Sequence, residues 1–416
     1  MPASMTGTAN NAQGEDRMSI SRRDILLGSA GAIGAATMPF PRPAIAQSSE
    51  PIKIGWLAAM TGPSSAPTVG FHRGVTFATN EINASGGVKG RKIEIVTRDT
   101  QGDPTKAVNA TQELISQVKV HAIWGPVNSG EALATTPLMA RAKIPDLHPC
   151  VVDTLIDTTK YPNAFRIAPS NGQWDDAVRS YCLKVLKIKK VAVIGDTTGY
   201  GVTAVKASVE AFKKDGADVV YSANVDATQP DMTPDMLRAK NAGAEAIVVW
   251  SVSTGMEARM FNTRGSMNWD VPFVGHPSLA SGELASLVEK PAYWEKVYAV
   301  GYKSCSYDKA GKLPDKSQQL VDRLTKAGIQ LQDTLLWWVA CGIDAVELIA
   351  KGVEASGSTD SAGIIKYWNS LTKYPGYFGS YTFTPTEHNG YPTDEIVMSE
   401  ARSAKNGTFA LAPGYT

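Results

Sequence analysis

Short apolar runs alternate with longer amphipathic stretches from residue 52 onward. The runs have the length of buried strands, and the stretches between them carry apolar residues at helical spacing. Repeated strand–helix units of this kind wind into a parallel sheet covered by helices on both faces. In the first series we expect strands at 52–58, 92–97, 122–124 and 144–149, and helices at 75–82 and 106–117.

The same alternation restarts after the segment 165–170, which is the first candidate joint between two lobes. This second series predicts helices at 171–186, 200–214, 234–241 and 254–264, strands at 190–195, 218–222, 245–251 and 271–275, and an extended segment at 298–303. Two further helices are expected at 317–327 and 333–355, and a last strand at 395–401. The pattern therefore predicts an α/β protein with two doubly wound parallel-sheet lobes. Such sheets bind ligands beyond the carboxyl ends of their strands, so a cleft is expected where the two meet.

One stretch, 121–134, contains a candidate binding site. Its apolar run ends at Gly125-Pro126, and a helix-forming segment begins behind Ser129. The amides of Gly130 and the two residues after it have no partner inside that helix and carry the positive end of its dipole. A carboxylate fits there. The alternative is that Ser129 only caps its helix.

Composition and charge narrow the class of protein. The chain is 43% hydrophobic and 19% charged, with 41 basic and 40 acidic residues, as in an ordinary globular protein. No basic stripe interleaved with aromatic residues is present, so nucleic acid is not an expected partner. Arg22-Arg23, a mild apolar segment and small residues near Ala46 predict a twin-arginine signal peptide over 1–46 and a periplasmic location. Met18 is an alternative start.

Metal and disulfide chemistry are not expected. The five histidines have no metal-ligand spacing, so we predict neither a metal nor another cofactor. An even number of cysteines in an exported protein allows three disulfide pairings. A twin-arginine substrate folds before export in a reducing compartment, which favours free thiols. The four residues concerned are Cys150, Cys182, Cys305 and Cys341.

The chain contains one imperfect match to a dinucleotide-binding motif of enzymes. The segment 199–204 fits the Gly-x-Gly-x-x-Ala form of the dinucleotide fingerprint, after a strand and before a helix. That fingerprint needs its first glycine at the strand end, but residues 196–198 intervene after Gly195. An exported dinucleotide-dependent oxidoreductase therefore remains only an alternative, and no catalytic residue is predicted.

Five motifs stand in order along the chain, at 54–63, 80–92, 99–104, 125–129 and 195–201. Together they resemble the periplasmic solute-binding proteins of branched-chain-amino-acid-type ABC transporters, the leucine/isoleucine/valine-binding family. The resemblance implies a monomer of two lobes, 51–169 plus 303–388 and 170–302 plus 389–416, joined by three crossovers. It also implies a protein that is not an enzyme, and that closes over a small ligand and delivers it to a membrane permease.

The resemblance also implies which residues bind the ligand. Ser129 and the amides beside it correspond to the carboxylate site, Tyr200 to the aromatic residue that covers the ligand, and His276 to an acid in the amino-acid binders. The full set of implied ligand-binding residues is Ser129, Gly130, Val151, Val152, Tyr200, Trp250, Ser253 and His276. For Tyr200 and Trp250, core packing is the alternative.

Two departures from the family pattern bear on the ligand. Val152 has no hydroxyl group for an ammonium, and His276-Pro277 stands where the amino-acid binders have an acid. An unpaired ammonium enclosed there is costly to desolvate, so an organic acid with an apolar or aromatic body is favoured. A branched-chain or other amino acid, or an amide, stays open as the alternative. Gly102 and Asn128 occupy the positions of the family disulfide, which again predicts free thiols.

Overall fold

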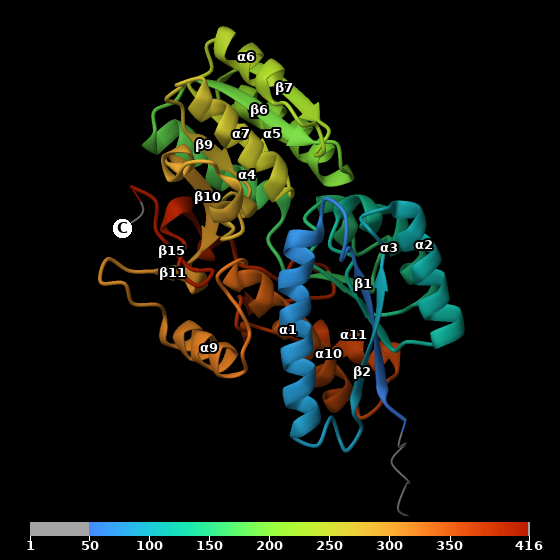
Figure 1. Cartoon of the computed structure of the whole chain (residues 1–416). Coiled ribbons are helices and arrows are strands. Elements are labelled where there is room, and N and C mark those ends of the chain that lie inside the picture. Colours follow the sequence, from blue (N-terminus) through green and yellow to red (C-terminus); the bar gives the residue numbers. More distant parts are fainter. Residues whose placement is uncertain (1–49, 415–416) are drawn as a thin grey trace, which may run out of the picture. The chain divides into compact units, whose positions relative to one another are not determined.

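A computed structural model describes residues 50–414. Its first sheet is parallel throughout, with strand order β2-β1-β3-β4-β5 (Figure 1). The strands are β1 (Ile52–Ala58), β2 (Ile93–Asp99), β3 (Ala122–Trp124), β4 (Asp146–His148) and β5 (Ala164–Arg166). The helices that follow or cover them are α1 (Ser65–Ala84), α2 (Pro104–Glu113), α3 (Ser129–Ala142), α10 (Leu336–Ser356) and α11 (Ser361–Trp368). We call this sheet and its helices the N-lobe.

The alternation of side chains along β1 explains the layering of the N-lobe. Ile54 and Trp56 pack in the same cluster as Phe71 of α1, whereas Leu57 packs in a second cluster with Met139 of α3. Successive strand residues point to opposite faces. A strand that is apolar at nearly every position must therefore be covered on both sides, as the apolar run predicted.

The second sheet, which with its helices we call the C-lobe, has the strand order β14-β10-β9-β8-β6-β7. Its strands are β6 (Lys190–Asp196), β7 (Asp218–Val225), β8 (Ala246–Trp250), β9 (Phe273–Gly275), β10 (Val297–Tyr302) and β14 (Ile396–Glu400). Its helices include α4 (Asn171–Ser180), α5 (Gly199–Lys214), α6 (Thr233–Asn241) and α7 (Thr254–Ser266). The predicted pair of doubly wound sheets is confirmed, with one difference. β14 runs antiparallel to β10 because it enters from the end of the chain and not from a strand–helix unit.

The chain passes between the two sheets three times. It leaves the N-lobe after β5, returns after β10, and crosses again before β14. The third crossing is bound to the edge of the first sheet, because the Arg166 amide donates to the His388 carbonyl and the Gly390 amide donates to the Arg166 carbonyl, both at 2.9 Å. β11 (Ser306–Tyr307) pairs with β15 (Phe409–Ala410), and β12 (Tyr374–Pro375) pairs with β13 (Ser380–Tyr381).

Several elements differ from the sequence prediction. α1 begins ten residues earlier than expected, at Ser65, because its first turns contain Ser, Pro, Thr and Gly and lack apolar periodicity. β5 has only three residues, one of them arginine, and most of it falls in the segment 165–170, which the sequence pattern predicted to be the joint between the two lobes. α11 was not predicted at all. The predicted signal peptide lies outside the described residues, and within residues 50–414 no helix is long and apolar enough to cross a membrane.

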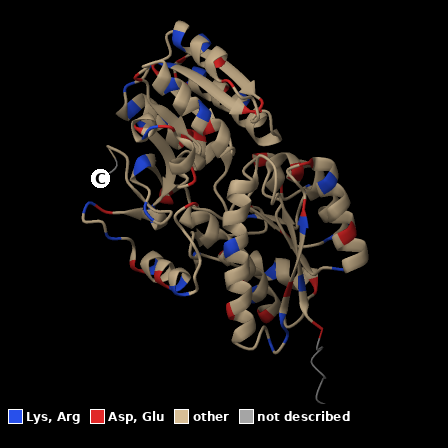
Figure 2. Cartoon of the chain, viewed as in Figure 1, with Lys and Arg blue, Asp and Glu red and all other residues tan. Residues whose placement is uncertain are grey.

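Charges of both signs are interspersed along the helices and strands (Figure 2). The 41 basic and 40 acidic residues nearly cancel over the whole chain. Most ion pairs are exposed, such as Lys296–Asp270 and Lys351–Glu354, and pairs of that kind contribute little to stability. The stability of the fold must therefore come mainly from its apolar core.

Candidate ligand-binding site

A cavity lies at the carboxyl ends of the strands, where residues of both lobes meet. Its wall comes from the segments after β1, β3, β4, β6, β8 and β9 and from the first turns of α4 and α10, the position expected for a ligand site in sheets of this class. The lining residues are Ser64, Pro67, Phe71, Val127, Asn128, Ser129, Pro149, Val151, Trp174, Tyr200, Val252, His276, Trp337 and Trp338. The cavity volume is about 40 Å³, which is room for on the order of two water molecules.

The N-terminus of α3 forms the polar end of this wall, and its cap differs from the sequence prediction. The residue that caps the helix is Asn128, whose Oδ1 accepts from the Gly130 amide at 2.8 Å. Ser129 is the first helical residue, and its hydroxyl oxygen accepts from the Val151 amide at 3.3 Å. The interpretation of Ser129 as the cap is therefore wrong. Because the Gly130 amide is bonded to the Asn128 side chain and the Ala132 amide to the Asn128 carbonyl, the amides of Ser129 and Glu131 are the backbone donors left at this helix end, beside the Ser129 hydroxyl.

The N-termini of α3 and α5 meet directly. A Cβ atom placed on Gly199 would lie 2.5 Å from the Cα of Gly130, a separation that real Cβ atoms do not adopt. Only two glycines allow the two helix ends to come this close. Tyr200 follows Gly199 and lines the cavity, so the contact brings the Tyr200 ring of the C-lobe to the α3 end of the cavity. Burial raises the pKa of the Tyr200 phenol well above its ordinary value, which keeps the hydroxyl protonated.

His276 provides a second C-lobe wall. The Ser278 amide donates to His276 Nδ1 at 3.1 Å, and the Ser278 hydroxyl lies 2.6 Å from the same atom; with Nδ1 as the acceptor of the amide, the ring proton is assigned to Nε2. Burial lowers the pKa of His276 to about 3, and the ring is neutral at ordinary pH. Behind it the Ser278 hydroxyl contacts Glu257, whose pKa burial raises well above the ordinary value. The histidine is therefore uncharged, and burial disfavours the charged form of the acid behind it.

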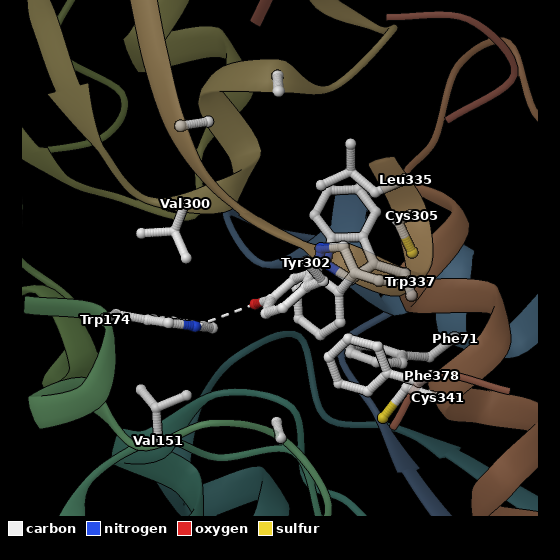
Figure 3. Close-up of a cluster of buried hydrophobic side chains, with 14 of the residues drawn as sticks. Phe71, Val151, Trp174, Val300, Tyr302, Cys305, Leu335, Trp337, Cys341 and Phe378 are labelled. Atoms are coloured by element: carbon white, nitrogen blue, oxygen red, sulfur yellow. Dashed lines mark hydrogen bonds between the residues drawn. The ribbon is translucent and has the colours of Figure 1, made fainter. Parts of the chain in front are cut away.

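Aromatic side chains make up much of the remaining wall. Trp174 contacts Tyr200, His276 and Trp337 edge-on, with ring centroids 6.5, 5.1 and 6.3 Å apart. Figure 3 shows Trp174 and Trp337 on either side of Tyr302, with the Trp174 indole N–H donating to the Tyr302 hydroxyl at 3.0 Å. Trp337 stacks on Phe378 at 5.1 Å. The rings hold one another in fixed orientations and enclose an apolar space.

Four of the eight residues implied by the family resemblance line this cavity: Ser129, Val151, Tyr200 and His276. Gly130 lies beside it in the contact with Gly199. The other three lie elsewhere. Val152 points the opposite way from Val151 and packs with Ala132, Cys150 and Leu155. Trp250 is fully buried in the core at the end of β8, and Ser253 caps α7 by accepting from the Met256 amide at 3.3 Å.

Several lining residues were not found from the sequence. Trp337 and Trp338 lie in the first turn of a helix that is apolar nearly all round, so no pattern separates them from the core. Trp174 lies inside the amphipathic segment of α4, where a tryptophan is most simply explained as packing. Asn128 lies within the motif at 125–129, and Ser64 directly follows the motif at 54–63. Asn128 Nδ2 donates to the Ser64 hydroxyl at 3.1 Å, which ties the loop after β3 to the start of α1.

The four cysteines are buried free thiols. Burial raises the pKa of the Cys182 thiol and raises that of Cys305 to about 12, so both remain protonated at ordinary pH. Among residues 50–414 no cluster of three His, Cys, Asp or Glu side chains could hold a metal ion. The described part of the chain therefore presents a donor-rich, largely aromatic cavity with no evident catalytic group.

Comparisons with known proteins agree with this architecture. The family model for periplasmic binding proteins matches residues 51–406. The chain is similar to the Leu/Ile/Val-binding protein homolog 3 of Brucella melitensis, with 27% identity covering 87% of this chain and 94% of the relative.

Two solved structures have the same fold. One is a branched-chain amino acid transporter substrate-binding protein of Streptococcus pneumoniae in complex with isoleucine, with a TM-score of 0.74, 23% identity, and 87% of this chain and 99% of the other covered. The other is a solute-binding protein of an ABC transporter of Rhodopseudomonas palustris in complex with p-hydroxybenzoic acid, with a TM-score of 0.69, 21% identity, and 86% and 95% covered. This chain belongs to the periplasmic binding protein family.

Proposed function

We propose that this protein is the solute-binding component of an ABC transporter and that its ligand is an organic acid with an apolar or aromatic body. The observation that carries the proposal is the chemistry of the cavity wall. None of the lining residues within the described chain is acidic, whereas several of them present hydrogen-bond donors. The protein binds and delivers its ligand to a membrane permease and is not an enzyme.

The α3 end of the cavity suits a carboxylate. The Ser129 hydroxyl accepts from the Val151 amide, and its proton, which also lies within reach of the Cys150 thiol, can turn to a ligand. The Ser129 amide points from the positive end of the α3 dipole, and an anion is favoured there. Tyr200, which directly follows Gly199, lines the same cavity from the C-lobe, and its protonated hydroxyl has no partner among the described residues. Together these groups provide neutral donors from both lobes to one carboxylate.

The same wall does not suit an ammonium group. A buried ammonium needs a nearby carboxylate, because an unpaired charge pays a desolvation penalty of several kcal/mol. His276 presents Nε2–H, a donor, where an acceptor would be required. Burial raises the pKa of Glu257, the acid behind it, and so disfavours the negative charge that would compensate a cation. An α-amino acid would therefore lose much of the affinity that its carboxylate gains.

The aromatic residues of the cavity wall indicate an apolar or aromatic group in the rest of the ligand. Trp174, Phe71 and Trp337 form an apolar wall on which a flat or branched group can pack. Relatives of this fold include one solved with isoleucine and one solved with p-hydroxybenzoic acid, so the fold accommodates both classes. The absence of an acid in this wall favours the second class for this chain.

Lobe closure belongs to the proposal as well. A cavity of about 40 Å³ is too small to admit an organic acid without movement. We place the lobes at 51–169 plus 303–388 and 170–302 plus 389–416, and they open and close about the three crossovers. Export by the twin-arginine route would deliver the folded protein to the periplasm.

Calorimetry with matched ligand pairs tests the proposal. Leucine is compared with its keto acid 4-methyl-2-oxopentanoate, and phenylalanine with phenylpyruvate. We expect the keto acid of at least one pair to bind more tightly than its amino acid. Tighter binding of the amino acid in each pair would show that the organic-acid assignment is wrong and that the amino-acid alternative holds.

A further inference from the structure

Two residues of the cavity wall have a buried polar atom with no hydrogen-bond partner among the described residues: the Tyr200 hydroxyl and the Trp337 indole nitrogen. Each side chain is only 3% exposed. Some buried indoles are bonded: Trp174 donates to the Tyr302 hydroxyl and Trp368 to the Leu348 carbonyl, both at 3.0 Å. Those of Trp124, Trp250 and Trp337 have no partner among the described residues, and of these three only Trp337 lines the cavity, where a ligand can reach it.

The chemistry of the indole narrows what could bind it. An indole Nε1–H is a donor only, so its partner must be an acceptor. A buried donor left without a partner destabilises the protein, and a ligand acceptor that meets it recovers that loss. Because a site of this kind penalises an analogue that lacks the acceptor, it produces strong discrimination.

Trp337 lies at a different part of the wall from the carboxylate end. Tyr200 is next to the Gly130–Gly199 contact, and Trp174 lies between Tyr200 and Trp337, with ring centroids 6.5 and 6.3 Å away. The Trp337 ring is fixed by stacking on Phe378 and by edge contact with Tyr302 at 5.3 Å (Figure 3). Its N–H therefore cannot swing to the carboxylate end without breaking the aromatic cluster.

We propose that the ligand carries a second oxygen acceptor, at the end remote from its carboxylate, and that the Trp337 indole N–H donates to it. The ligand class is then a hydroxylated or oxo-substituted acid and not an unsubstituted one. This inference rests on the proposed function, since it takes the carboxylate to lie at Ser129. It makes Trp337 a specificity-determining residue that contacts the ligand directly.

The experiment measures a ratio of affinities. Calorimetry on the wild-type protein compares 4-hydroxybenzoate with benzoate and with 4-methylbenzoate, which has a similar size but no oxygen at that position. We expect 4-hydroxybenzoate to bind at least tenfold more tightly than either, and Trp337→Phe to reduce the ratio to less than threefold. The wild-type ratio tests the inference even if the variant fails to fold.

Trp124→Phe is the matched control. Trp124 is also buried in the N-lobe, its indole nitrogen also has no partner among residues 50–414, and it does not line the cavity. Its substitution should leave the ratio unchanged. Equal binding of the three acids by the wild type, or a ratio that survives Trp337→Phe, would overturn this inference alone. If none of the acids binds and leucine or phenylalanine does, the proposed function fails and takes this inference with it.

Discussion

Replacing Ser129 by alanine tests the carboxylate end of the site most directly. The side chain is 2% exposed, and its oxygen accepts from the Val151 amide at a long 3.3 Å. Asn128 and not Ser129 caps α3, so the substitution leaves the helix cap in place. The main loss is then the hydrogen bond from the Ser129 hydroxyl to the ligand carboxylate. A bond to a charged group contributes about 1.5–3 kcal/mol, or roughly ten- to a hundredfold in affinity.

The assay separates binding from folding. Calorimetry measures the affinity of Ser129→Ala for the tightest acid found for the wild type, and thermal unfolding without ligand measures its stability. Ser403→Ala is the control, because its hydroxyl also accepts from a backbone amide, that of Ala410 at 2.7 Å, and lies away from the cavity. We expect the control to lose stability but not affinity. An affinity of Ser129→Ala within threefold of the wild type would refute the assignment of the carboxylate to this helix end.

Three further predictions follow from particular residues. Burial raises the pKa of Glu131 to about 7, above the 4.5 expected in the unfolded chain, so its protonation favours folding and stability falls as pH rises from about 4.5 to 7. In urea unfolding, the free energy of unfolding of the wild type should fall by on the order of 3 kcal/mol between pH 5 and pH 8. Glu131→Gln, whose side chain cannot ionise, should not show this fall, and a pH profile identical to that of the wild type would contradict the prediction. Gly199→Ala places a Cβ against Gly130, so solution scattering should no longer show the ligand-induced decrease in radius of gyration expected of the wild type. Joint replacement of Arg22 and Arg23 by lysine should leave precursor in the cytoplasm, and normal export would exclude the twin-arginine route.

The fold followed from the sequence because apolar periodicity is strong in long elements and in buried strands. The runs at β1 and β6 are apolar on both faces, and only a sheet covered on both sides buries them fully. β5 was not predicted, although β3, β4 and β9, which also have three residues, were. Arg166 interrupts its apolar run, and its pairing with β4 is a tertiary effect.

The site was predictable only where local chemistry determines it. The turn before α3 was identified because glycine, proline and capping residues specify a helix start, but Asn128 and Ser129 are both good caps and the pattern could not choose between them. Val151 and Val152 are adjacent in a loop, where no period indicates which side chain faces the cavity. Trp337 comes from a helix more than 130 residues beyond Tyr200, and only the packing of the two lobes brings them to one wall.

The proposed preference for an organic acid depends on whether one position of the cavity wall donates or accepts a hydrogen bond. The family resemblance implies an acid at the loop after β9 in amino-acid binders, and an acid there accepts from a ligand ammonium. In this chain the Ser278 amide fixes the His276 tautomer so that the same position donates instead. Because burial holds the pKa of His276 near 3, the ring stays neutral at any ordinary pH and the donor cannot become a fixed cation. A neutral N–H donor cannot accept a hydrogen bond from an ammonium and provides no charge to compensate it. It can, however, donate a hydrogen bond to a ligand oxygen without a large desolvation penalty. Under the organic-acid proposal, this one difference in the wall accounts for the change from an amino acid to an organic acid as the ligand.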